Sequence, residues 1–234
     1  MTTTAQQIAD DAWKILGDYL GTPGVRWPSA DVLIYINAGQ REAVLHLPSA
    51  CTKAVIATVA AGTRQTMSGL SITDGIRFLG VTRNFASNGT TVGRAITPRP
   101  MAWINAERPF WHMDTAAELV HSFHDPMDPK AIYVWPPATG SAKAEFIYSA
   151  IPADVATIGG NIALDDIYVN ALTYYVLFRA MTKQQNFAQN ALASTFYQLF
   201  LQSLGVKGQN DKGSDPNLGM ATDGAGVAGP GAHA

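Results

Sequence analysis

The stretch from Ile162 to Leu204 constrains the fold of this chain more than any other part of its sequence. Apolar residues recur there at spacings of three and four, which is the period of an amphipathic α-helix, in two runs separated by a polar cluster at residues 182–186. The two runs predict a helical hairpin that ends at Gly205 and whose aromatic side chains belong to the core. Their members are Tyr168, Ala171, Leu172, Tyr175 and Phe178, followed by Ala188, Leu192, Phe196, Leu199, Phe200 and Leu204.

Charged residues agree with this hairpin. Asp165 and Asp166 precede the first apolar run, where free amides and the positive helix end favour carboxylates. Arg179 and Lys183 lie near its other end, where cations are favoured. We therefore assign both aspartates to the helix start and not to acid–base catalysis.

Two further helices are expected at the N-terminus. Thr4 and Gln7 have the spacing of a capping box, and the apolar stripe that follows runs to Gly21. Ser29 is a suitable start for a second helix that ends before Pro48. Because neither helix pair can bury its apolar stripe alone, we expect the four helices to meet in space.

Between Lys53 and Pro152 the sequence changes to short runs rich in Val, Ile and Thr. They predict about six short strands, among them Ala54–Ala60, Thr91–Thr97, Ile132–Trp135 and Ala144–Ser149, with a hairpin at Asn88-Gly89. The prolines of this region are expected to fall between the strands, where a missing amide does no harm. The pattern indicates an antiparallel β domain.

The fold class is therefore α+β, a helical bundle with an inserted antiparallel β domain and an extended C-terminal tail. We expect an N-terminal helix pair at residues 1–52, the β domain at 53–152, the helix hairpin at 153–205 and the tail at 206–234. The tail is rich in Gly and Ala and cannot bury enough apolar area to order itself. Something outside the protomer must hold it, such as a neighbouring chain, with its larger side chains as anchors, namely Val206, Leu218, Met220 and Val227.

Composition excludes several classes of protein. Only 15% of residues are charged and 47% are apolar, with a formal net charge of -2, so no basic excess favours a tight nonspecific grip on nucleic acid. A single cysteine, Cys51, precludes an internal disulfide. No apolar run reaches the ~20 residues that span a bilayer, and no export signal is expected.

The sequence contains no recognisable catalytic constellation, metal site or cofactor site, and we expect none. His121 and His124 are the best candidate metal ligands, but residues three apart on a strand point to opposite faces. His112 has no serine or cysteine elbow to serve. An enzyme is therefore the least favoured class.

Charge is unevenly distributed along the β region. Five arginines, whose only neighbouring acid is Glu107, precede a segment from Phe110 to Asn170 that holds eight acids. One hypothesis is that the two segments form complementary faces which join copies head to tail, and the alternative is that folding intermingles them. The candidate inter-subunit residues are Arg77, Arg83, Arg94, Arg99 and Arg108.

Eight fragments of the chain, in order, resemble the head-to-tail adaptor (connector) proteins of tailed bacteriophages. They are WPSADVLIYINAGQREAV, GTRQTM, VTRNF, GRAI, PFWH, HDPMDPKAIYVWPP, YSAIPADV and DIYVNALTYYVLFRAMTKQ, and they cover about residues 5–205. The resemblance implies a structural virion protein, made in the bacterial cytoplasm, that assembles as a dodecameric ring beneath the portal. It also implies a conduit for double-stranded DNA, with a tail or nozzle protein and tail fibres as further candidate partners.

A different class of function stays open at the level of sequence. The β domain could be a binding module for carbohydrate or nucleic acid that uses Trp103, Trp111 and Trp135 as stacking surfaces and the five arginines as a phosphate track. Size separates the two hypotheses, since an adaptor forms a large ring and a binding module does not.

Overall fold

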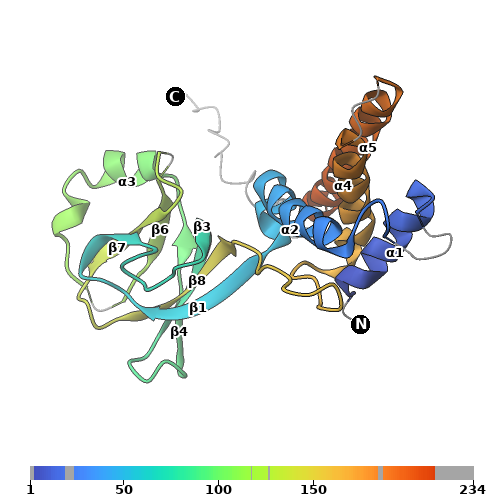
Figure 1. Cartoon of the computed structure of the whole chain (residues 1–234). Helices are drawn as coiled ribbons and strands as arrows, with labels where there is room; N and C mark the ends of the chain where they lie inside the picture. The colour runs from blue at the N-terminus through green and yellow to red at the C-terminus, as the bar shows by residue number, and fades with distance from the viewer. Residues whose placement is uncertain (1–2, 19–23, 117, 126, 184–186, 214–234) are drawn as a thin grey trace, which may run out of the picture. The chain divides into compact units, whose positions relative to one another are not determined.

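The computed structural model describes residues 3–18, 24–116, 118–125, 127–183 and 187–213. These residues form an α+β protein with five α-helices and two four-stranded sheets. The chain divides into two compact units, which we call the helical unit and the β unit (Figure 1). The helical unit comprises Met1–Gly39, Thr157–Asn161 and Asp166–Ala234, and the β unit comprises Gln40–Ala156 and Ile162–Asp165.

The first helix, α1 (Ala5–Leu16), begins at the predicted capping box. The Thr4 hydroxyl accepts from the Gln7 amide while the Gln7 side chain accepts from the Thr4 amide, so two amides without helical partners are satisfied. The predicted end at Gly21 is wrong. Gly17 takes the left-handed conformation, with φ +70°, that closes a helix.

Helix α2 (Ser29–His46) begins at the predicted residue and ends just before Pro48. Within the helical unit, Gly39 faces the side chains of Leu172 and Tyr175. A Cβ placed on Gly39 would lie 2.9 Å from Cδ1 of Tyr175 and 3.3 Å from Cδ2 of Leu172. This close approach explains a glycine inside a helix, where it otherwise costs about 1 kcal/mol relative to alanine.

Helix α4 (Val169–Thr182) is the central element of the helical unit, since it packs against both α1 and α5. Its C-terminal end also contacts the start of α2. The Lys183 ammonium donates to the Asp31 carboxylate at 2.6 Å, and the Arg179 guanidinium lies 5.4 Å from the centre of the Tyr35 ring.

Two tryptophans join the loop before α2 to this assembly. The Trp13 indole donates to the carbonyl of Trp27 at 2.9 Å, and the Trp27 indole donates to the carbonyl of Ala180 at 3.3 Å. Both side chains are buried, so each polar nitrogen has the partner that burial requires.

The start of α4 differs from the prediction. A short 3-10 turn, Asp166–Tyr168, precedes the helix, and the Asp166 carboxylate accepts from the amide of Thr3 at 2.7 Å. The Ala5 amide donates to the carbonyl of Gly160 at 2.9 Å. Asp166 therefore fastens the N-terminal segment to the chain before α4 and does not cap α4 itself.

Helix α5 (Phe187–Gly213) runs alongside α4 (Figure 1) and passes through the predicted stop at Gly205. The Gly205 boundary is therefore wrong, and the predicted tail shortens at its start to residue 214. Leu204 is buried, and the Lys207 ammonium lies 5.8 Å from the centre of the Tyr168 ring. These contacts on both sides of Gly205 offset the small helix cost of one glycine.

The β unit contains two sheets with strand orders β1-β8-β3-β4 and β2-β7-β6-β5. The strands of the first sheet are all antiparallel to their neighbours, as predicted, whereas the two residues of β5 pair with β6 in parallel. The strands are β1 (Thr52–Thr58), β2 (Gly62–Thr66), β3 (Gly75–Phe85), β4 (Val92–Ala95), β5 (Thr97–Pro98), β6 (His121–His124), β7 (Ala131–Ala138) and β8 (Lys143–Ala150).

The predicted strand Thr91–Thr97 is divided in two. Ile96 is only 4% exposed, and the chain crosses from one sheet to the other at this residue. The predicted Asn88-Gly89 hairpin before it is confirmed, with Gly89 at φ +73°. The core of the unit is formed by inward-facing residues of both sheets, among them Phe78, Val81, Ile132, Val134 and Phe146.

The prediction that prolines fall between strands is wrong for Pro98, Pro136 and Pro137. The last two lie in β7, which has neighbours on both sides. They are tolerated because the β2–β7 register shifts between Gly62 and Arg64, and because β6 pairs with β7 only as far as Trp135.

A short helix, α3 (Met101–Glu107), follows β5 and was not predicted. A small apolar cluster of Ile104, Trp111 and Phe123 links it to the second sheet. Among the helices of the described ranges, none has the length and apolar character needed to cross a membrane.

Candidate interaction surface

The five arginines of the predicted inter-subunit surface all lie in the β unit and are all exposed. Arg77 and Arg83 are on β3, Arg94 is on β4, Arg99 follows β5, and Arg108 ends α3. Two of them form an ion pair with a carboxylate of the same chain, and three form none within the described residues.

Arg83 and Arg108 are neutralised within the chain. The Arg83 Nε lies 3.0 Å from Oε2 of Glu145, and the Arg108 Nη1 lies 3.3 Å from Oδ2 of Asp114. A hydrogen bond from the Thr82 hydroxyl, and after it Arg83, hold the pKa of Glu145 below its ordinary value. Folding therefore brings part of the acidic segment onto the arginine segment.

Arg77, Arg94 and Arg99 form no ion pair with any carboxylate in the part of the chain that the structure describes. Arg94 lies on an edge strand whose four residues are all exposed. Arg99 stacks over the Trp103 ring at 5.6 Å from its centre. These three cations are the members of the predicted set that stay available to a partner.

Arg99 begins a row of stacked groups on the second sheet. The Trp103 and His121 rings meet edge to face at 5.2 Å, His121 stacks on Trp135 at 5.7 Å with only 11° between the planes, and Arg108 lies 5.1 Å from the Trp135 ring. Burial is the main cause that lowers the pKa of His121, and nearby Arg99 and Arg94 lower it further. Both effects favour the neutral form of the His121 ring.

The tryptophans do not form one stacking platform. Trp111 is only 1% exposed, Trp135 is half-buried between His121 and Arg108, and Arg99 lies over the ring of Trp103, which is 36% exposed. This arrangement is against the hypothesis of a carbohydrate or nucleic-acid module with three stacking tryptophans.

Phe110 and Met113 are among the exposed apolar residues of the β unit, at 77% and 79% exposed. They flank buried Trp111 in the loop after α3. Sequence analysis missed them, although the string PFWHM places three large side chains on one short loop that cannot bury all of them.

His121 and His124 do not assemble a metal site. His121 stacks among aromatic rings, whereas His124 lies at the end of β6, where partial desolvation of its ring and then Arg77 lower its pKa. Over the described ranges, no group of three or more His, Cys, Asp or Glu side chains is placed to hold a metal ion.

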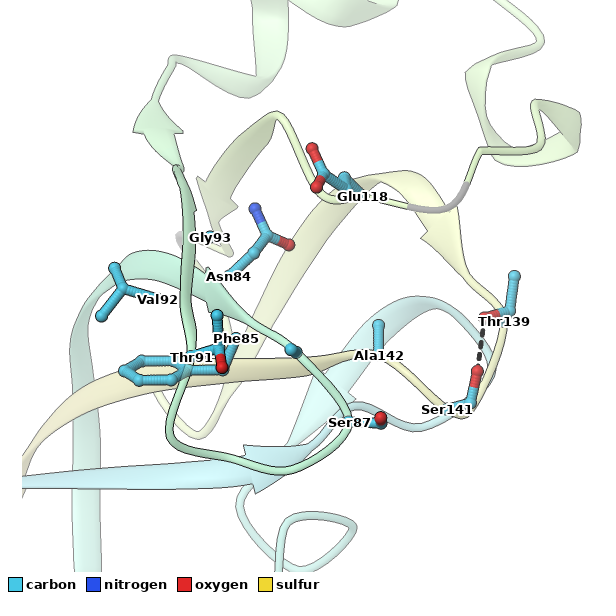
Figure 2. A pocket seen from close by; sticks show the side chains of 11 residues that line it. Asn84, Phe85, Ser87, Thr91, Val92, Gly93, Glu118, Thr139, Ser141 and Ala142 are labelled. Carbon is cyan, nitrogen blue, oxygen red and sulfur yellow. Dashed lines mark hydrogen bonds between the residues drawn. The ribbon is translucent and has the colours of Figure 1, made fainter.

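A pocket of about 520 Å³ lies between the β3–β4 hairpin and the turn before β8 (Figure 2). Its polar lining is mostly committed to internal bonds. The Thr139 and Ser141 hydroxyls bond each other at 3.2 Å, and the Asn84 amide bonds backbone groups of Arg94 and Leu119. Glu118 lies at the rim. The pocket is an open groove on the surface of the β unit.

Of the predicted tail anchors, Val206 lies on α5 and is 59% exposed. Leu218, Met220 and Val227 lie outside the described residues.

The sequence model of the SU10 adaptor proteins matches residues 3–220, which is nearly the whole chain. The chain belongs to the SU10 adaptor protein family. Members of this family are phage head-to-tail adaptors, so the predicted family resemblance is confirmed, and the match reaches beyond the expected limit at residue 205 into the tail. No curated protein matches the chain.

Family membership identifies the adaptor as a structural component of the virion that associates with other virion components. The class is a structural and not an enzymatic one.

Proposed function

We propose that this adaptor assembles into a closed ring of copies that joins the portal to the tail and lines part of the conduit for double-stranded DNA. Membership of a head-to-tail adaptor family over residues 3–220 is the observation that carries the proposal. The expected ring has twelve copies and sits beneath the portal, with a tail or nozzle protein and tail fibres as candidates for its other face.

In this proposal the four longer helices act as a bundle from which the β domain projects as an insertion. The arginines without a carboxylate partner, Arg77, Arg94 and Arg99, contact the neighbouring copy. Heterologous contacts of this kind close into a ring when the rotation per copy divides a full turn. Arg83 and Arg108 serve the protomer, since each is paired within the β unit.

The C-terminal tail provides attachment, with Val206, Leu218, Met220 and Val227 as anchors on the portal or on a neighbouring copy. Because α5 continues to Gly213, the segment to test is 214–234 and not the whole of 206–234.

The test compares the full chain with a chain that ends at Gly213. Mass photometry and negative-stain images of the full chain should show rings, and the full chain should co-sediment with portal particles. The shortened chain should keep its helix content and its melting temperature but lose attachment or ring cohesion. A full chain that stays monomeric with and without portal would overturn the ring, and a shortened chain that attaches equally well would overturn the role of the tail.

A further inference from the structure

The edge strand β1 presents unpaired backbone groups along its whole length. It pairs with β8 on one side through seven consecutive residues, and no described strand lies on its other side. The Ala150 amide donates to Cys51 and the Val59 amide donates to Ala142, so the odd-numbered residues of β1 direct their backbone groups at β8. By alternation, Thr52, Ala54, Ile56 and Thr58 direct theirs outward.

This edge lacks the usual protection against pairing with another strand. It has no proline and no register shift, and its one charge, Lys53, is paired with Asp74. The other edges are protected. Strand β4 has four residues, a register shift and Arg94, β2 has a register shift, and β5 has two residues, one of them Pro98.

We propose that β1 accepts the C-terminal segment of a neighbouring copy as an added strand, with residues 218–222 of that segment on the outward edge. This inference rests on the proposed ring, which places copies next to each other, and it selects the neighbouring copy as the binding surface for this part of the tail.

The length and composition of the segment fit this role. Residues 214–234 follow the end of α5, and at about 3.3 Å per extended residue they span tens of ångströms. The run Leu218-Gly-Met-Ala-Thr222 has neither a proline nor a charge, so each of its residues can donate and accept backbone bonds. An added segment can use all of its backbone groups to pair with β1. By contrast, a sheet edge of the neighbouring copy is a poor partner for β1, because the three other edges are protected.

Disulfide trapping between two chains tests the proposal, in full-length protein that carries Cys51→Ala. One chain has Ile56→Cys. The other has a single cysteine at one of four positions, Leu218→Cys, Gly219→Cys, Met220→Cys or Ala221→Cys. After mixing and mild oxidation, we expect cross-linked pairs of the two chains, strong at alternate tail positions because side chains of a strand alternate between faces.

Ring formation is measured on the same samples by mass photometry. Rings without any cross-link overturn this inference and leave the proposed function intact, whereas absence of rings overturns the proposed function. Cross-linked pairs formed by the Ile56→Cys chain alone would show that β1 pairs with β1, which also overturns the inference. In a chain that carries both Ile56→Cys and Met220→Cys, a disulfide formed only within one chain would place the segment on its own copy. That result would also overturn the inference.

A second variant series tests the backbone bonds directly. Ala54→Pro removes an outward amide while the ladder to β8 stays complete, and Ala54→Val is the matched control that keeps the amide. We expect the tail cross-link to fall at least several-fold in Ala54→Pro and to persist in Ala54→Val, with similar melting temperatures. An unchanged cross-link in a folded Ala54→Pro chain would contradict strand pairing at this edge.

Discussion

Asn84 shows how one short side chain can connect three segments of the β unit. Its amide nitrogen donates to the carbonyls of Arg94 at 2.9 Å and Leu119 at 2.7 Å, and its oxygen accepts from the Leu119 amide at 3.0 Å. Ser149 is equally buried, but its hydroxyl has no hydrogen-bond partner among the described residues. The two residues are therefore buried polar groups with opposite energetic roles.

Alanine substitution should separate these roles. Asn84→Ala leaves buried backbone groups unsatisfied and should lower the free energy of unfolding by about 2–4 kcal/mol. Ser149→Ala removes an unpaired hydroxyl and should leave stability unchanged or raise it by about 0.5–1 kcal/mol. Urea unfolding of the two variants checks both values, and a large loss in Ser149→Ala would show that its hydroxyl is bonded.

Asp74 links β unit stability to pH. The Lys53 ammonium is the main cause that lowers the pKa of Asp74, and the Tyr148 hydroxyl lowers it further by donating at 3.1 Å. A lowered pKa stabilises the fold at pH values above the unfolded value of about 3.9, and this contribution is lost as pH falls through the folded value.

Asp74→Asn should therefore reduce the dependence of the free energy of unfolding on pH under acidic conditions. Between about pH 5 and pH 2.5 the free energy of unfolding should fall less in the variant than in the unmodified chain. Chemical denaturation at several pH values measures the difference, and two parallel curves would be inconsistent with this role.

At the scale of elements, hydrophobic periodicity predicted helices and strands well where one face is buried. It predicted them poorly where a tertiary contact determines the end of the element. The capping box at Thr4 and the start of α2 at Ser29 were predicted because their bonds are local. The end of α5 was not, because contacts to Tyr168 and the buried Leu204 carry the helix past Gly205. Strand β7 was cut short because its prolines are tolerated only by a register shift that no local pattern reveals.

The candidate surface was predictable in part for the same reason. The five arginines are visible in the sequence, but which of them are neutralised depends on Glu145, which folding brings to Arg83 from β8, and on the turn that brings Asp114 back to Arg108. Helix α3 was missed because seven residues give too short a period, although Pro100 before a run of helix formers is a recognisable start.

Two helical glycines offer a matched test of packing. Gly39→Ala would place a methyl group 2.9 Å from the Tyr175 ring and should lower stability by about 1–3 kcal/mol despite its better helix propensity. Gly205→Ala meets no described atom within 4 Å and should raise stability by about 0.5–1 kcal/mol. Thermal melts of both variants decide the matter, and stabilisation in both would mean that α2 and α4 are not in close contact.

For the whole molecule, assembly should depend on the arginines that the protomer leaves without a carboxylate. Reversing Arg94 and Arg99 together to glutamate should abolish most rings with little change in melting, because repulsion at an interface costs several kcal/mol and exposed charges stabilise little. Arg83→Glu is the control, since it should affect the pair with Glu145 within the protomer and spare the rings. Intact rings in the double variant at physiological salt would refute the role of Arg94 and Arg99.

The assembled adaptor should not hold DNA tightly. A formal net charge of -2 leaves few cations to neutralise phosphates, and a conduit works best when the polymer slides. Anisotropy of a labelled duplex at physiological salt should show a Kd weaker than about 1 μM. Tighter binding that declines steeply with added salt would contradict this expectation.

The tie between the N-terminal segment and the residues before α4 has a consequence for synthesis on the ribosome. The Thr3 and Ala5 amides bond to Asp166 and to Gly160, so the first helix cannot find these partners until more than half of the chain has emerged. At about 5–20 residues per second, this delay is on the order of 10–30 s. The β unit, almost continuous from Gln40 to Ala156, can fold during that interval. In a nascent adaptor the apolar stripe of α1 is therefore exposed to solvent for many seconds. A chaperone would bind it during this period.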